Sequence, residues 1–157
     1  MTKQSLKIGN RAPEFSLADA TGAKIRLGDF KGRWVVLYFY PKDDTSGCTL
    51  EAREFSKAAK DFKAASAIVV GVSKDNVASH DRFKAKHRLA LTLASDEDTE
   101  TAKAYGVWVK KSMYGRQYMG MERATFLIDS RGLIRRIWRK VKVPGHVADV
   151  LNAVKAI

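Results

Sequence analysis

Residues 34–48 of the chain read WVVLYFYPKDDTSGC, and this stretch decides the fold. Seven consecutive hydrophobic residues, 34–40, indicate a strand that is buried on both faces of a sheet. Pro41 ends that strand, because proline has no backbone N–H to give to a neighbouring strand. The polar residues 43–46 are all good N-terminal caps for a helix. Cys48, the only cysteine of the chain, is therefore expected in the first turn of the helix that follows.

The rest of the chain alternates between predicted strands and helices. We expect strands at 14–19, 23–30, 67–73, 91–96, 125–129 and 133–138, and helices at 47–63, 76–87, 99–105 and 146–157. Turn residues at 21–22 and 130–132 indicate two hairpins, so the sheet should contain antiparallel pairs as well as parallel ones. The order resembles a thioredoxin-like α/β fold, with a central mixed β-sheet flanked by helices and an N-terminal β-hairpin extension.

Length and composition indicate one domain with a core of its own. The chain has 157 residues, of which 45% are hydrophobic, and we expect a single domain over residues 1–157. One cysteine forms no internal disulfide, which suits a reducing compartment. The first ten residues contain no apolar run typical of a signal peptide, and no segment reaches the ~20 apolar residues that span a bilayer. We therefore expect a cytoplasmic protein without a membrane partner.

The net charge of +12 raises the question of a nucleic-acid partner. Residues 110–142 hold ten Lys and Arg against only Glu122 and Asp129. No Cys/His finger, RNP-type aromatic pattern or basic arm accompanies this charge. We interpret it as a solvated basic face, with attraction of acidic partners or anionic substrates as the alternative.

The apolar stripe of the helix at 47–63 predicts where Cys48 points. Ala52, Phe55, Ala59 and Phe62 share one helix face, and Cys48 lies four residues before Ala52 on the same face. The thiol should therefore face inward. The free N–H groups and the positive dipole end of the helix favour the thiolate over the thiol.

Three nearby carboxylates, Asp43, Asp44 and Glu51, oppose a thiolate, so the site needs a cation. Arg123 is the candidate, because it directly precedes the strand at 125–129. If that strand runs antiparallel to 34–40, Arg123 lies at the sheet edge where the helix begins. Cys48 and Arg123 therefore indicate a reactive pair of thiol and guanidinium. The residues by themselves do not indicate which reaction the pair carries out.

A longer pattern around Cys48 resembles a known family. Pro41, Thr45 and Cys48 form PxxxTxxC, the active-site signature of peroxiredoxins. The wider segment YFYPKDDTSGCTLEAREF is similar to the bacterioferritin comigratory protein, or peroxiredoxin Q, subfamily. The resemblance continues through GVSKDNVASHDRFKAKHRLALTLASDED, YGVWVKKSMYGRQYMGMERATFLID and IWRKVKVPGHVADVL, and so covers nearly the whole chain.

The resemblance implies a thiol-dependent peroxidase that reduces hydrogen peroxide and organic hydroperoxides. Cys48 would attack a peroxide oxygen and become a sulfenic acid, while Arg123 would stabilise the thiolate and the developing charge. The Thr45 hydroxyl and the N–H groups of Gly47 and Cys48 would bind the peroxide. Further residues would shape or brace the site: Pro41 shields the sulfur, Glu51 braces Arg123 and Tyr40 lines the pocket.

The sulfenic acid must be reduced by a thiol from outside the chain. Many relatives carry a second cysteine five residues after the first, but this chain has Arg53 there and no other cysteine. We expect glutathione, glutaredoxin or thioredoxin as the reductant, and the resemblance implies a monomer. Two other readings stay open: a redox-sensing or chaperone-like protein switched by Cys48, and a basic DNA-associated protein.

Neither a metal nor an organic cofactor is expected. The three histidines, His80, His87 and His146, are scattered without ligand spacing and are interpreted as structural. Residues 112–120 are expected to form a flexible lid or a packed loop. The three methionines in and beside that segment, at 113, 119 and 121, are expected to pack.

Overall fold

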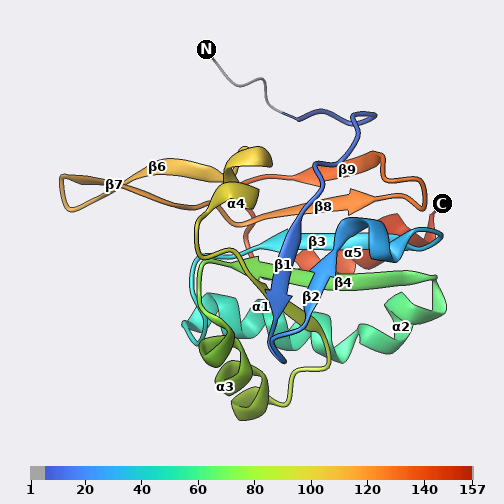
Figure 1. The fold of residues 1–157 in the computed structure, drawn as a ribbon, viewed down its shortest axis with the longest axis horizontal. Coiled ribbons are helices and arrows are strands. Elements are labelled where there is room, and N and C mark those ends of the chain that lie inside the picture. The colour runs from blue at the N-terminus through green and yellow to red at the C-terminus, as the bar shows by residue number, and fades with distance from the viewer. Residues whose placement is uncertain (1–5, 157) are drawn as a thin grey trace.

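The computed structural model describes residues 6–156, which form a seven-stranded mixed sheet and a separate two-stranded one (Figure 1). The strand order in the large sheet is β2-β1-β5-β4-β3-β8-β9. Its strands are β1 (Ser16–Asp19), β2 (Lys24–Arg26), β3 (Trp34–Phe39), β4 (Ala67–Ser73), β5 (Thr92–Ser95), β8 (Ala124–Ile128) and β9 (Ile134–Trp138). The expected mixed sheet and both expected hairpins are confirmed. The strand expected at 23–30 is too long, because β2 ends at Arg26 and residues 27–30 form a 3-10 helix.

β3 lies near the middle of this sheet and sets the direction of its neighbours. It runs parallel to β4 and antiparallel to β8, and all of its residues after Trp34 are buried. Alternate side chains enter two cores: Leu37 and Phe39 pack on one face, Val36 and Tyr38 on the other. A continuous apolar run is therefore the sequence that this position requires.

Helices cover both faces of the sheet (Figure 1). The core that contains Tyr38 also takes residues of α1 (Ser46–Lys57), α2 (Ala59–Ala64), α3 (Val77–His87) and α5 (His146–Lys155). The core that contains Phe39 takes residues of the short η1 (Leu27–Phe30) and of α4 (Glu100–Ala104). This arrangement is the thioredoxin-like fold with an N-terminal hairpin that the sequence predicts.

The single helix expected at 47–63 is wrong, because the structure divides it into α1 and α2 at Ala58. Ala58 has φ −91° and ψ 3°, which lies outside the helical region. Alanine has the highest helix propensity, so the residue type gives no sign of a break. Phe55 and Phe62, one on each side of the break, are both buried in the same core. Tertiary packing therefore overrides local propensity here.

The lid or packed loop expected at 112–120 is also wrong. These residues belong to a regular hairpin of β6 (Trp108–Met113) and β7 (Arg116–Met121). Tyr114 and Gly115 at its tip both have positive φ, the conformation of a two-residue type I′ turn. Tyrosine is unusual at the first of these positions, which hid the turn. Met113 and Met119 are exposed, contrary to the expected packing, whereas Met121 is buried.

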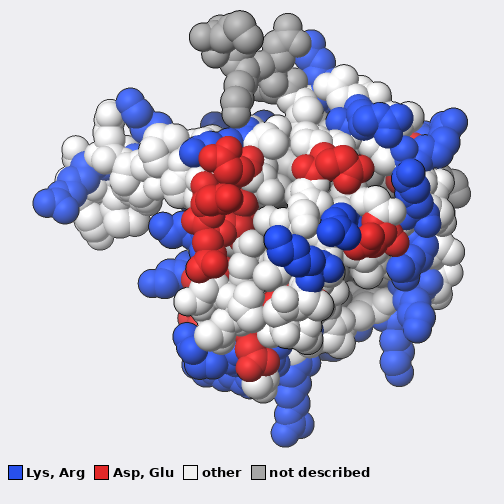
Figure 2. Space-filling model, viewed as in Figure 1, with Lys and Arg blue, Asp and Glu red and all other residues white. Residues whose placement is uncertain are grey.

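Charged side chains are spread over the surface. On the face shown in Figure 2, Lys and Arg lie mainly around the rim and Asp and Glu form smaller patches. Among the helices of residues 6–156, none is long and apolar enough to cross a bilayer.

Gly71 of β4 lies so close to the Tyr38 ring of β3 that a larger side chain at this position would clash. A Cβ atom added at Gly71 would lie 2.7 Å from Cζ of Tyr38, whose ring is fully buried. Gly71→Ala should therefore lower the free energy of unfolding by about 1–3 kcal/mol, the usual cost of overpacking a core. Urea unfolding measures this change. Gly28→Ala is the control, because its added Cβ meets nothing nearer than 3.9 Å. Equal stability of the two variants would contradict the prediction.

Candidate active site

The loop between β3 and α1 places Cys48 at a helix start. Thr45 is the N-cap of α1, and Thr49 N–H donates the first helical hydrogen bond to the Thr45 carbonyl at 2.8 Å. The N–H groups of residues 46–48 therefore precede the intrahelical bonds and can serve a ligand. Cys48 faces inward as expected, with 1% of its surface exposed. The sulfur is therefore almost fully enclosed by the surrounding protein.

Arg123 comes to this helix start from a segment distant in the sequence. Phe39 at the end of β3 pairs with Ala124 at the start of β8, so Arg123 directly precedes the paired region. Its Nη2 donates to Sγ of Cys48 at 3.4 Å, and its Nη1 donates to Oε1 of Glu51 at 2.7 Å. The juxtaposition expected from the strand directions is confirmed. Gly47 leaves room for the guanidinium, since a Cβ there would lie 3.2 Å from Nη2.

Glu51 is fully buried one turn after Cys48. Its Oε1 accepts from Arg123, whereas its Oε2 has no hydrogen-bond partner among the described residues. Burial raises the pKa of Glu51 to about 7, against the attraction and hydrogen bond of Arg123. The carboxyl group thus holds Arg123 in place, while burial disfavours its own ionised form.

The other three expected site residues lie in the same loop with different contacts. The Thr45 hydroxyl donates to the Lys42 carbonyl at 2.9 Å, which leaves its oxygen lone pairs free to accept a hydrogen bond. Pro41 is half-buried between β3 and α1. Tyr40 is buried, and its hydroxyl donates to Oδ1 of Asp43 at 2.5 Å. Its polar group is thus engaged by this carboxylate.

A buried network that sequence reasoning missed fixes the loop to the rest of the protein. His80 of α3 places Nδ1 2.7 Å from Oδ2 of Asp43 and Nε2 3.0 Å from the carbonyl of Ala94. Both ring nitrogens of His80 therefore have a polar partner in this buried network. Asp43 N–H also donates to Asp75 at 2.8 Å. Asp43 is therefore paired, and its charge opposes the thiolate less than its sequence position suggests.

Asp44 also has partners in α3. Its two carboxylate oxygens lie 2.7 Å from Lys86 Nζ and 2.8 Å from His87 Nε2. These contacts join residues more than forty positions apart. No local pattern in the sequence could have indicated them.

A second cation, Lys111 of β6, lies near the site and was likewise missed. Its Nζ donates to the Met121 carbonyl at 2.5 Å, two residues before Arg123. Burial lowers the pKa of Lys111, and the neighbouring Arg123 lowers it further. The base of the β6–β7 hairpin therefore adjoins the Cys48 site.

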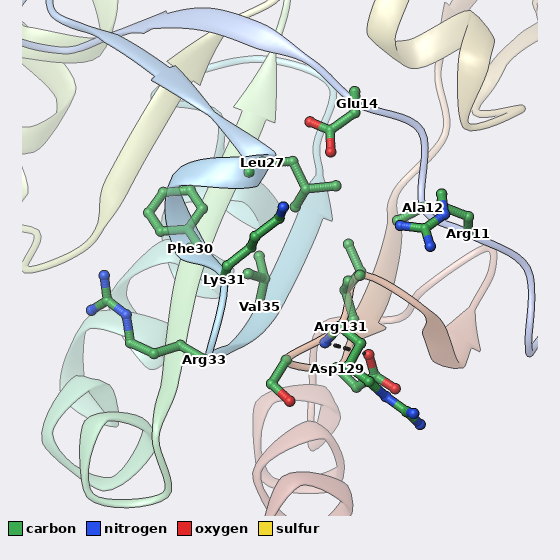
Figure 3. Close-up of a pocket in the computed structure, with 14 residues that line it drawn as sticks. Arg11, Ala12, Glu14, Leu27, Phe30, Lys31, Arg33, Val35, Asp129 and Arg131 are labelled. Atoms are coloured by element: carbon green, nitrogen blue, oxygen red, sulfur yellow. Dashed lines mark hydrogen bonds between the residues drawn. The ribbon is translucent and has the colours of Figure 1, made fainter.

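Two further observations concern the described residues away from Cys48. No group of three or more His, Cys, Asp or Glu is arranged there to hold a metal ion. A pocket shown in Figure 3 is lined by residues at the opposite end of the sheet, including Val35, near the start of β3, and Ile128, at the end of β8. Several basic residues, among them Arg11, Lys31 and Arg131, surround it, and Cys48 is not part of it.

The arrangement at Cys48 combines a thiol, a cation and free N–H donors. The guanidinium and the helix start favour the anionic sulfur, which is the nucleophilic form of cysteine. The same donors would stabilise negative charge on an oxygen held beside the sulfur. The site is therefore suited to attack on an electrophilic oxygen of a small substrate.

Comparisons with known proteins agree with this chemistry. Residues 8–137 match the model of the AhpC/TSA family. A putative peroxiredoxin bcp of Coxiella burnetii is 48% identical, covering 94% of this chain and 98% of that protein. Peroxiredoxin Bcp of Bacillus subtilis is 44% identical, covering 96% of each chain.

Solved structures give the same result. A PrxQ variant of Xylella fastidiosa superposes with a TM-score of 0.93 at 40% identity, covering 98% of both chains. The bacterioferritin comigratory protein of Xanthomonas campestris, described for its alkyl peroxide reduction activity, has a TM-score of 0.87 at 44% identity over 90% of both chains. From its sequence, fold and site geometry, the chain belongs to the AhpC/TSA family, among the peroxiredoxins of the Bcp/PrxQ type.

Proposed function

We propose that this chain, a thiol-dependent peroxidase, reduces hydrogen peroxide and organic hydroperoxides at Cys48. The observation that carries the proposal is the fork of Arg123, which contacts the Cys48 sulfur and the buried Glu51 together. No described contact favours a redox-sensing, chaperone-like or DNA-associated role over this one.

The proposed reaction begins with attack of the Cys48 thiolate on the terminal peroxide oxygen. An S–O bond forms, the O–O bond breaks and the sulfur is oxidised by two electrons. The leaving oxygen takes a proton and departs as water or an alcohol, and Cys48 is left as a sulfenic acid. Arg123 and the N–H groups of the first turn of α1 stabilise the negative charge that moves along the breaking bond.

Further residues position the peroxide in this proposal. The Thr45 oxygen accepts a hydrogen bond from the peroxide, because its own proton is directed to Lys42. The N–H groups of Gly47 and Cys48 donate to the peroxide oxygens. Pro41 shields the sulfur from water, and Tyr40 supports the loop through Asp43.

An external thiol completes the cycle. Two different cysteines have been substituted in the Xanthomonas PrxQ structures, whereas this chain has Cys48 alone and Arg53 five residues later. We propose reduction by glutathione, glutaredoxin or thioredoxin, acting on a monomer with one domain over residues 1–157. A lone thiol suits the reducing cytoplasm, where we place the protein.

Removal of Arg123 tests the proposed role of the fork. Arg123→Ala should slow oxidation of Cys48 by one equivalent of hydrogen peroxide by about 10²–10³-fold, the effect of losing a preorganised charge-stabilising donor. Quenched mass and thiol titre measure the rate, and Cys48→Ser should show no sulfenic acid. Arg136→Ala removes an equal charge from an exposed position of β9 and serves as the control. Wild-type speed in Arg123→Ala would refute the assigned role.

The raised pKa of Glu51 predicts a pH dependence of stability. The folded pKa of about 7 lies above the ordinary 4.5, so between these values the folded state binds the proton and the unfolded state releases it. Wild type should therefore lose stability relative to Glu51→Gln as the pH rises through this window, by up to about 1.4 kcal/mol per pH unit. Urea unfolding at several pH values measures the difference. A relative stability that rises with pH would contradict the assignment.

His146 predicts the opposite slope. Burial lowers the pKa of His146 from 6.5 to about 4, and Arg123 lowers it further against the attraction of Asp149. Between these values the unfolded state binds the proton, so wild type should gain stability relative to His146→Gln as the pH rises. The same unfolding series measures it. If the stability of wild type relative to each variant changed with pH in the same direction for both, the pKa shift assigned to Glu51 or to His146 would be wrong.

A further inference from the structure

The β6–β7 hairpin is an arm whose two strands pair only with each other among residues 6–156. It pairs with no strand of the seven-stranded sheet and projects from the body of the protein (Figure 1). Its second strand leads through Glu122 directly to Arg123. The arm therefore begins at the end of the sheet where Cys48 lies. An isolated two-stranded hairpin buries little apolar surface of its own.

Large hydrophobic side chains are concentrated on this arm. Of the six exposed among the described residues, four belong to it: Met113 is 56% exposed, Tyr114 98%, Tyr118 44% and Met119 48%. Grouped exposed apolar residues typically mark an interaction surface. Tyrosine and methionine are enriched in such surfaces.

The strand register separates the arm into two faces. Residues directly opposite each other share a face, so Met113 lies with Arg116, and Lys111 lies with Tyr118 two positions away. These four residues form the outer part of the first face, and Val109 opposite Gly120 continues it toward the base of the arm. The second face carries Lys110 opposite Met119, followed by Ser112 opposite Gln117.

The first face is the one that adjoins Cys48. Lys111 belongs to it, and its Nζ reaches the Met121 carbonyl beside Arg123. A Cβ added at Gly120, on this same face, would lie 3.1 Å from the Lys111 side chain. The Lys111 side chain therefore lies along this face toward the base of the arm. A partner seated on the first face would be brought to the rim of the Cys48 site.

The arm is positively charged, which favours a partner with an acidic surface. Residues 108–121 contain Lys110, Lys111 and Arg116 and no acidic residue, and the arm in Figure 2 is blue and white without red. A second copy of this chain, with its net charge of +12, would present the same cations and be repelled. An acidic surface would gain electrostatic steering toward the site.

We propose that the face formed by Lys111, Met113, Arg116 and Tyr118 docks the protein that reduces oxidised Cys48. The inference rests on the proposed function. The partner is a dithiol protein whose reactive cysteine lies in an apolar surface bordered by acidic residues. The apolar pair Met113 and Tyr118 contacts that surface, and the two cations face its border.

The docked dithiol supplies both electrons of the reduction. Its first thiolate attacks the sulfur of the Cys48 sulfenic acid, an S–S bond forms, and the hydroxide takes a proton and leaves as water. Its second thiolate then attacks the partner's own sulfur in the mixed disulfide. This step releases the Cys48 thiolate and leaves the partner as an internal disulfide.

The two faces supply a matched pair of variants. Met113→Ser with Arg116→Glu alters a cross-strand pair on the first face. Met119→Ser with Lys110→Glu alters a pair on the second face by the same methionine substitution and the same reversal of charge. Peroxide turnover is measured with thioredoxin, recycled by its reductase and NADPH, and with dithiothreitol. The first-face variant should raise the KM for thioredoxin about tenfold through slower docking, with unchanged turnover by dithiothreitol. The second-face variant should keep the wild-type KM.

Other outcomes overturn the docking proposal. Equal effects of the two variants on the KM for thioredoxin would show that docking does not depend on the first face. A loss with dithiothreitol as well would indicate damage to the Cys48 site rather than lost docking. If the wild type turned over with dithiothreitol but not with thioredoxin, the proposed docking of a dithiol protein would be refuted, while the proposed peroxidase activity would stand. Failure of the wild type with both thiols would remove the proposed function itself. A dimer lost only in the first-face variant would assign the face to a second copy.

Discussion

The antiparallel pairing of β3 and β8 is the constraint on which the Cys48 site depends. It places residue 123 beside the end of β3, from which the chain turns into α1 and reaches Cys48. Arg123 thereby meets two groups of α1, the sulfur and the buried Glu51 carboxyl. A parallel β8 would begin at the other end of the sheet and leave the sulfur with the helix start alone. The reactive cysteine is thus a product of sheet topology as much as of its local motif.

Each acidic neighbour of Cys48 has its own partners elsewhere in the protein. Asp43 is paired with His80, Asp44 with Lys86 and His87, and Glu51 with Arg123. Breaking a buried pair leaves an unpaired charge, which costs far more than an exposed pair gains. The pairs of Asp43 and Glu51 are the buried ones, so they hold the loop and the guanidinium most firmly. Glu51 therefore anchors the guanidinium beside the sulfur, whereas Asp43 anchors the loop before α1.

Sequence reasoning succeeded where a local pattern determines the structure. The apolar runs at 34–40 and 67–73 are typical of buried strands, and the stripe through Cys48, Ala52 and Phe55 gave the inward orientation of the thiol. Arg123 could be placed because strand direction alone brings it to the helix. The break at Ala58 and the turn at Tyr114 were missed, because neither residue type is typical of the conformation it adopts. The partnership of His80 with Asp43 was missed because it joins residues 37 positions apart through packing.

The chain contains one sulfhydryl group, so every thiol signal from the protein has the same origin. In proteins with several cysteines, a bulk titration averages over sites, and isotopic or peptide-level mapping is needed to separate them. Here the loss of the free thiol, or the alkylation of a cysteine, comes from a single atom, the sulfur of Cys48. A thiol titration of the whole protein therefore reports the state of that atom without any engineered background.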